Sequence, residues 1–118
     1  MPHSDPTSFM VHELSAAIQA RRLLPIAVVE AYLARIEARE PKLQAFVAVY
    51  AADARLAAEA ADKAIRSGHS VGPLHGIPIA LKDLIEIEGK IVSGGCEAWR
   101  NRKAARTATL ARASSRRA

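Results

Sequence analysis

The stretch "GPLHGIPIALKD", residues 72–83, joins a Gly/Pro-rich turn to a short apolar run that ends in a lysine. Residues 77–81 favour a short strand. Lys82 at its end has two interpretations. One is a surface lysine on an edge strand, paired with Asp83 or Glu86. The other is a partly desolvated lysine whose lowered pKa makes it a proton acceptor for a hydroxyl nucleophile.

Helical periodicity dominates the sequence before this stretch. A first helix is expected to begin near Thr7 or Ser8, either of which can cap it. Its apolar stripe comprises Val11, Leu14 and Ile18.

A second helix is expected from Pro25, which suits a first helical position, to Glu40, because Pro41 follows. Its apolar stripe comprises Ile26, Val29, Leu33 and Ile36. Residues 43–50, "LQAFVAVY", then favour a short buried strand.

A third, alanine-rich helix is expected over residues 52–67, with Gly68 as the residue that ends it. Its small side chains permit close packing against a neighbouring element. Residues 84–87, "LIEI", predict a further strand after the opening stretch. Helices that alternate with strands in this order indicate a mixed α/β fold rather than a helical bundle.

The charge is divided unevenly along the 118 residues, a length that suits one small domain. The formal net charge is +5, yet all twelve acidic residues lie at or before Glu97, and seven of the seventeen basic residues lie from Arg100 onward. We therefore divide the chain into residues 1–99 and a basic, weakly ordered tail, residues 100–118. A nucleic-acid or acidic-surface interaction would rest on this tail, and without interleaved aromatics it would be non-specific.

Several classes of protein are disfavoured by composition. Cys96 is the single cysteine, which excludes an internal disulfide and a cysteine-based metal site. No run approaches the roughly 18 apolar residues that span a membrane. The N-terminal residues lack the pattern of a secretory signal, so the expected location is cytoplasmic. The four histidines are scattered, and neither a metal nor a cofactor is expected.

Other residues with chemical potential have plainer interpretations. His75 lies in a turn, where hydrogen bonding to loop backbone is favoured over a catalytic triad with Asp83. Ser93 with Gly94 and Gly95 can form a backbone nest for an anion, although a plain turn explains them as well. Cys96 has no base that the sequence places beside it, so a structural loop position is favoured over a nucleophile.

The residues of "GPLHGIPIALKD" resemble the signature segment of the amidase signature family, the Ser-cis-Ser-Lys amide hydrolases. The preceding "ELSAAIQARRLLPIAVVEAYLARIEAREPKLQAFVAVYAADARLAAEAADKAI" and the following "GKIVSGG" extend the resemblance over about residues 10–99. The resemblance implies the N-terminal part of an α/β/α fold with an incomplete central sheet. It also implies that Lys82 is the catalytic lysine, which relays a proton through the cis-serine to and from the serine nucleophile. Asp83 matches the acid that commonly follows this lysine.

The sequence departs from the family pattern in three places. Leu24 stands where the family has a capping Ser or Thr. Ile91 and Cys96 stand near positions where the family commonly has Pro and Ser. The resemblance implies a Gly/Ser-rich segment with both serines well downstream of Lys82, but only 36 residues follow Lys82 in this sequence. Ser114 and Ser115 do not match that segment, because they are flanked by Ala113 and Arg116 and not by glycines. We expect a truncated or frameshifted reading frame, which the other two frames downstream of codon 110 would reveal.

The expected function is that of an amidase fragment that acts on a small-molecule amide, with Lys82 present and both serines absent, and therefore inactive alone. The alternative within the family is the glutamine-hydrolysing component of a glutamyl-tRNA(Gln) amidotransferase, which releases ammonia from glutamine for transfer to a charged tRNA. The alternative of another class is non-specific binding of nucleic acid or an acidic surface through residues 100–118. Neither a membrane nor a specific nucleic acid is an expected partner.

Overall fold

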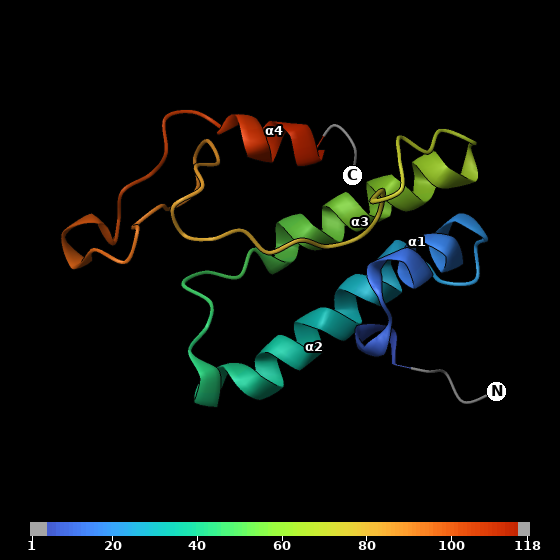
Figure 1. Ribbon diagram of the computed structural model, residues 1–118, viewed down its shortest axis with the longest axis horizontal. Helices are drawn as coiled ribbons and strands as arrows, with labels where there is room; N and C mark the ends of the chain where they lie inside the picture. The colour runs from blue at the N-terminus through green and yellow to red at the C-terminus, as the bar shows by residue number, and fades with distance from the viewer. Residues whose placement is uncertain (1–4, 116–118) are drawn as a thin grey trace. The chain divides into compact units, whose positions relative to one another are not determined.

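The computed structural model describes residues 5–115, with side chains up to residue 112. The chain divides into two compact units, one up to Pro78 and one from Ile79 onward. The first unit holds a short 3-10 turn, η1 (Pro6–Ser8), and three helices, α1 (Val11–Gln19), α2 (Pro25–Leu43) and α3 (Ala51–Arg66). The second holds a 3-10 turn, η2 (Glu97–Trp99), and the short helix α4 (Thr109–Ser115) (Figure 1).

The first helix begins later than predicted. Asp5 caps η1 by accepting a hydrogen bond from the Thr7 backbone N–H, at 2.9 Å, and Phe9 is extended with φ −78° and ψ 147°. Thr7 and Ser8, the predicted caps, lie within this turn and do not cap the first helix, so α1 starts only at Val11. Its N-terminus is held instead by Glu13, whose Oε2 accepts from the Met10 N–H at 2.7 Å.

The end predicted for the second helix is also wrong, because α2 runs through Pro41 to Leu43. Proline removes one backbone hydrogen bond, which would be costly in a buried helix. Residues 37–39 are exposed, so solvent can satisfy the carbonyl that loses its partner. The helix ends at Gln44, which is left-handed with φ 47° and donates its N–H to the Glu40 carbonyl.

The strands predicted at residues 43–50, 77–81 and 84–87 are not formed. The last residue of α2 occupies the start of the first segment, and residues 44–50 form an exposed connection. Within residues 5–115, the only ladder-type pairings are two isolated bridges, Glu88 with Ala104 and Ile91 with Lys103. The described chain is thus helical with almost no strand, and the central sheet of the expected α/β fold is not seen in it.

The core of the first unit lies where α1 and α2 meet the chain that follows α3. It is built from Leu14, Ile18, Val28 and Ile77, and half-buried apolar side chains surround it: Phe9, Leu23, Tyr32, Ile65 and Leu74. The predicted α1 stripe is confirmed at Leu14 and Ile18, whereas Val11 is 55% exposed.

In α2, Val29 from the predicted stripe is buried, while its other three members are half-buried. The prediction missed Val28, which is fully buried.

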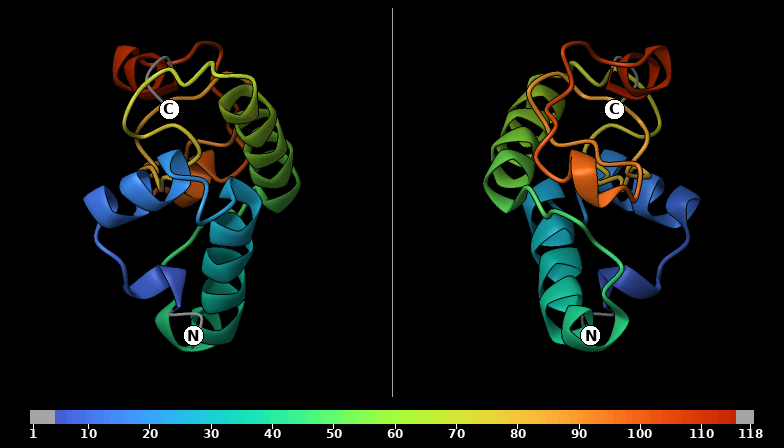
Figure 2. Two further views of the ribbon diagram at one scale, coloured as in Figure 1. Left: turned by 90° about the vertical axis from the view of Figure 1, so that its right-hand side faces the viewer. Right: turned by 90° about the vertical axis from the view of Figure 1, so that its left-hand side faces the viewer.

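Helix α3 runs back alongside α2, and Figures 1 and 2 show the two from three directions. Its buried residues are Ala58 and Ala61, which confirms that small side chains permit close packing here. Arg55 of α3 reaches Glu30 of α2 through two hydrogen bonds, from Nε at 2.5 Å and from an Nη at 3.0 Å. Gly68, with φ +82°, follows the end of the helix as predicted.

Candidate functional site

The turn that carries Lys82 lies in the second unit, which begins at Ile79. The Lys82 carbonyl accepts a hydrogen bond from the Ile85 N–H at 2.9 Å, which closes a tight turn over residues 82–85. The Lys82 side chain is exposed. The strand expected before it is absent, and the partial desolvation inferred from that strand is therefore not observed. The catalytic role of Lys82 stays a prediction.

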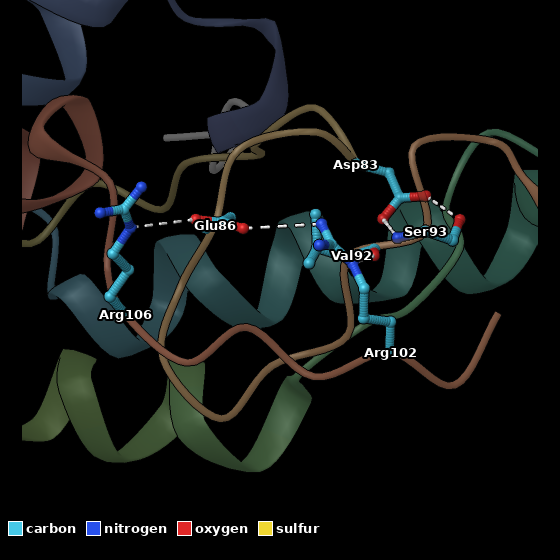
Figure 3. Close-up of polar contacts among 6 residues, drawn as sticks. All are labelled: Asp83, Glu86, Val92, Ser93, Arg102 and Arg106. Atoms are coloured by element: carbon cyan, nitrogen blue, oxygen red, sulfur yellow. Dashed lines mark hydrogen bonds and ion pairs between the residues drawn. The ribbon is translucent and has the colours of Figure 1, made fainter. Parts of the chain in front are cut away.

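The two acids considered as ion-pair partners of Lys82 are engaged elsewhere. Asp83 binds Ser93, and Glu86 pairs with Arg102 and Arg106, as Figure 3 shows. Neither pairing predicted for Lys82 is found in the part of the chain that the structure describes.

Asp83 and Ser93 are joined by two hydrogen bonds between the Asp83 carboxylate and Ser93. The Asp83 Oδ1 accepts from the Ser93 backbone N–H at 2.9 Å, and Oδ2 accepts a short hydrogen bond from the Ser93 hydroxyl (Figure 3). The Asp83 backbone carbonyl also accepts from the Gly94 N–H at 2.7 Å. Side-chain and main-chain oxygens of one residue therefore hold the same loop.

These bonds favour the charged carboxylate. The hydroxyl of Ser93, and then its backbone N–H, lower the pKa of Asp83 below the usual value, and the N–H groups of Gly95 and Gly94 add to the effect. The sequence allows a backbone nest for an anion at Ser93, Gly94 and Gly95. The structure shows that the anion facing this loop is the chain's own Asp83 carboxylate.

Ser93 itself is poorly suited to be a nucleophile. It is 7% exposed, and its hydroxyl both donates to Asp83 and accepts from the Gly95 N–H at 3.3 Å. A carboxylate with a lowered pKa is a weak base, so it does not activate the hydroxyl. Asp83 and Ser93 therefore form a structural contact.

The loop before Lys82 is held in the first unit. His75 is buried, and its Nδ1 accepts from the Val71 backbone N–H at 3.3 Å. This confirms the interpretation of His75 as a histidine that bonds loop backbone. Gly76 follows with φ +85° and packs against Pro25 and Ala61. The Gly/Pro-rich turn of the opening stretch thus docks on the N-terminus of α2.

The segment after Lys82 is tied to residues 102–108 by backbone hydrogen bonds. Gly89 N–H donates to the Ala104 carbonyl at 2.9 Å, and Ala104 N–H donates to the Lys90 carbonyl at 3.0 Å. Val92 N–H donates to the Arg102 carbonyl at 2.9 Å. The division of the chain at residue 99 stays a prediction, and these bonds cross it.

Much of the basic charge near this segment is neutralised internally. Glu86 pairs with Arg102 at 3.5 Å and with Arg106 at 3.7 Å (Figure 3). Arg102 also lies over the Trp99 ring, with 5.1 Å from its guanidinium carbon to the ring centroid. Arg100 pairs with Glu97.

The remaining candidate residues are readily placed. Cys96 is an exposed loop residue. The side chains of Ser114 and Ser115, together with Arg116 and Arg117, lie outside the described residues. Within residues 5–115 no group of three potential metal ligands occurs. No helix in the same range is long and apolar enough to cross a bilayer.

Comparison with known proteins places the segment in a family. The family model described as "Amidase" matches residues 27–114. The A-type subunit of the glutamyl-tRNA(Gln) amidotransferase of Geobacter metallireducens is 43% identical over 79 residues, covering 67% of this chain and 16% of that protein. An amidase of Pseudomonas putida is 37% identical over 86 residues, covering 73% of this chain and 18% of that protein. The chain thus spans about a sixth of the length of these relatives.

Proposed function

We propose that this chain, which belongs to the amidase family, supplies the lysine of an enzyme that hydrolyses carbon–nitrogen amide bonds. Lys82 is the residue that we assign to this role. The observation that supports the assignment is its place in a family segment, as the exposed first residue of a turn whose next residue is held by the loop at Ser93.

In the proposed mechanism a serine attacks the amide carbonyl, and Lys82 accepts its proton through the cis-serine and later returns it to the leaving amine. Backbone amides stabilise the oxyanion. A lysine acts as such a base once it is desolvated. Lys82 is exposed in this segment, so we infer that the rest of the amidase domain covers it.

The 118-residue polypeptide alone is expected to show no amide turnover. Its sequence has no Gly-flanked serine pair, and a base without its nucleophile leaves only minor residual rate enhancement. Hydrolysis of a simple amide by this polypeptide that disappears in Lys82→Ala would contradict this expectation.

The test of Lys82 exchanges the matched segment between relatives. In the Pseudomonas putida amidase, the 86 aligned residues are replaced by those of this chain. We expect the chimaera to hydrolyse amides and its Lys82→Ala form to lose activity by a factor of a thousand or more, on the order seen when a triad member is removed. Lys63→Ala, an exposed lysine on α3, is the matched control. An active Lys82→Ala chimaera would refute the assignment.

A second candidate is the glutamine-hydrolysing component of a tRNA amidotransferase. It is favoured by the higher identity to the Geobacter metallireducens amidotransferase protein, 43% against 37% for the amidase. The same segment exchange in that protein distinguishes the two when ammonia released from glutamine is assayed. If the exchanged segment is active in only one of the two recipient proteins, the substrate class of that protein is favoured for this chain.

The interaction proposed for residues 100–118 with nucleic acid or an acidic surface gains little support. Arg100, Arg102 and Arg106 already pair with Glu97 or Glu86. Deletion of residues 100–118 tests it, because a salt-dependent affinity for nucleic acid that this deletion removes would support the interaction.

A further inference from the structure

Asp83 occupies a special position because it directly follows the proposed base and has three bonds to one distant loop. Its two carboxylate oxygens accept from the Ser93 N–H and hydroxyl, and its carbonyl accepts from the Gly94 N–H. The loop is closed further by the bond from the Gly95 N–H to the Ser93 hydroxyl. The segment from Asp83 to Ser93, whose ends are ten positions apart in the sequence, is thereby closed into a ring.

This ring fixes the backbone on the C-terminal side of Lys82. The Lys82 carbonyl is also fixed, by the Ile85 N–H at 2.9 Å. The side chain of Lys82 is exposed and has a flexible four-carbon stem. The position of its amino group therefore depends on the conformation of the backbone at Lys82. A base that is misplaced by about 1 Å can lose about a hundredfold in rate.

We propose that Asp83 is a positioning residue for Lys82, because it holds the turn of the lysine to the Ser93–Gly95 loop. The proposal rests on the proposed function of Lys82. Asp83 does not take part in proton transfer, since its oxygens are occupied by Ser93. Ser93 takes part in the same positioning, because it donates the two hydrogen bonds that the Asp83 carboxylate accepts.

An alternative role for Asp83 is electrostatic, as an adjacent anion that favours the protonated lysine. The positioning role and the electrostatic role differ in which variants they predict to change the activity or its pH profile. Positioning requires the bonds to Ser93, so Ser93→Ala should lower the activity as Asp83→Ala does, but by less. An electrostatic role requires only the charge, so Asp83→Asn should move the pH profile and Ser93→Ala should not.

The first experiment uses the 118-residue chain and needs no activity. Amide hydrogen exchange and NMR order parameters are measured for residues 82–85 and 93–95 in wild type, Asp83→Ala and Ser93→Ala. We expect faster exchange at both segments in both variants, and no change in Asp62→Ala, a half-buried carboxylate of α3 that pairs with Arg66. Unchanged order at residues 82–85 would overturn the proposal.

The second experiment uses the chimaera of the Pseudomonas putida amidase. We expect Asp83→Ala to lower kcat about tenfold to a hundredfold with KM within about twofold. Ser93→Ala should lower kcat less, Ser93→Thr should restore it, and the double alanine variant should fall no further than Asp83→Ala. The pH limbs of kcat/KM should stay in place throughout.

The possible failures are distinguishable. An unchanged kcat in an Asp83→Ala chimaera, or a pH limb that moves only in Asp83→Asn, would overturn positioning while leaving Lys82 as the base. An active Lys82→Ala chimaera would instead refute the proposed function itself.

Discussion

Gly76 and Pro25 are separated by fifty-one positions in the sequence, yet a Cβ added to Gly76 would lie 2.8 Å from the Cγ of Pro25 and 3.1 Å from its Cβ. Gly76 also has φ +85°, a conformation that side chains other than hydrogen disfavour. This close contact docks the loop before Lys82 onto the first turn of α2.

Gly76→Ala is therefore expected to destabilise the first unit. The left-handed backbone alone costs roughly 1–2 kcal/mol for a residue with a Cβ, and the overlap with the rigid proline ring adds to it. Thermal and denaturant unfolding followed by circular dichroism measure the loss.

Gly68→Ala separates the two contributions to this loss. Gly68 has φ +82°, and a Cβ there would meet nothing within 4 Å. It should therefore show the backbone cost of roughly 1–2 kcal/mol alone. Equal losses of stability for the two variants would contradict the close packing of Gly76 on Pro25.

Leu14→Ala tests the core of the first unit. Leu14 is 1% exposed and packs with Ile18, Val28 and Ile77. The variant should lose about 2–5 kcal/mol of unfolding free energy in denaturant titration, because it removes buried methyl groups and leaves a cavity. Val11→Ala on the same helix is the control, since Val11 is more than half exposed and should change stability little. A comparable loss at both positions would exclude this core.

The helices of this chain were predictable because helix signals are local. The apolar stripes of α1 and α2, the alanine face of α3 and Gly68 after its end all follow from spacing over a few turns. The end of α2 was not predictable in this way. The free-energy cost of Pro41 depends on whether the surrounding backbone is exposed, and that is a property of the folded chain. The strands failed for a related reason: β-propensity at residues 43–50 or 77–81 forms no strand without a partner to bond.

The site was predictable in parts. The loop role of His75 followed from its place in a turn, and its bond to the Val71 N–H confirms it. The assignment of Lys82 rests on its motif and stays a prediction. The contact between Asp83 and Ser93 was missed, although the sequence "SGG" at residues 93–95 signalled a backbone nest for an anion. No rule of spacing indicated that the anion is a carboxylate ten residues earlier in the same chain.

Glu86→Gln tests the pairing of the segment after Lys82 with residues 102–108. Loss of the charge removes the ion pairs with Arg102 and Arg106. Amide hydrogen exchange at Ala104 and Ala108, which donate to the carbonyls of Lys90 and Glu86, should accelerate modestly. The effect should be larger at low salt, since partly exposed ion pairs are screened. Glu88→Gln, at an exposed neighbouring position, is the control. Identical exchange in the two variants would show that these ion pairs do not support the pairing.

The pH dependence of the second unit should follow Asp83. The pKa of this carboxyl is lower in the folded chain than in the unfolded chain, first because the Ser93 hydroxyl donates to it. The folded state therefore binds this proton less readily. The stabilising contribution of the charged Asp83 carboxylate is complete above the unfolded pKa, about 3.9, and is lost as pH falls through the lower folded value.

Carbon-detected NMR titration of Asp83 measures the shift of its pKa directly, and Ser93→Ala should raise this pKa toward the unfolded value. As the pH falls through the lowered pKa of Asp83 in the folded chain, the order of residues 93–95 should decline in wild type. It should change little over the same range in Asp83→Asn, which has no proton to gain. A titration of Asp83 that Ser93→Ala leaves unmoved would show that the hydroxyl does not hold the carboxylate.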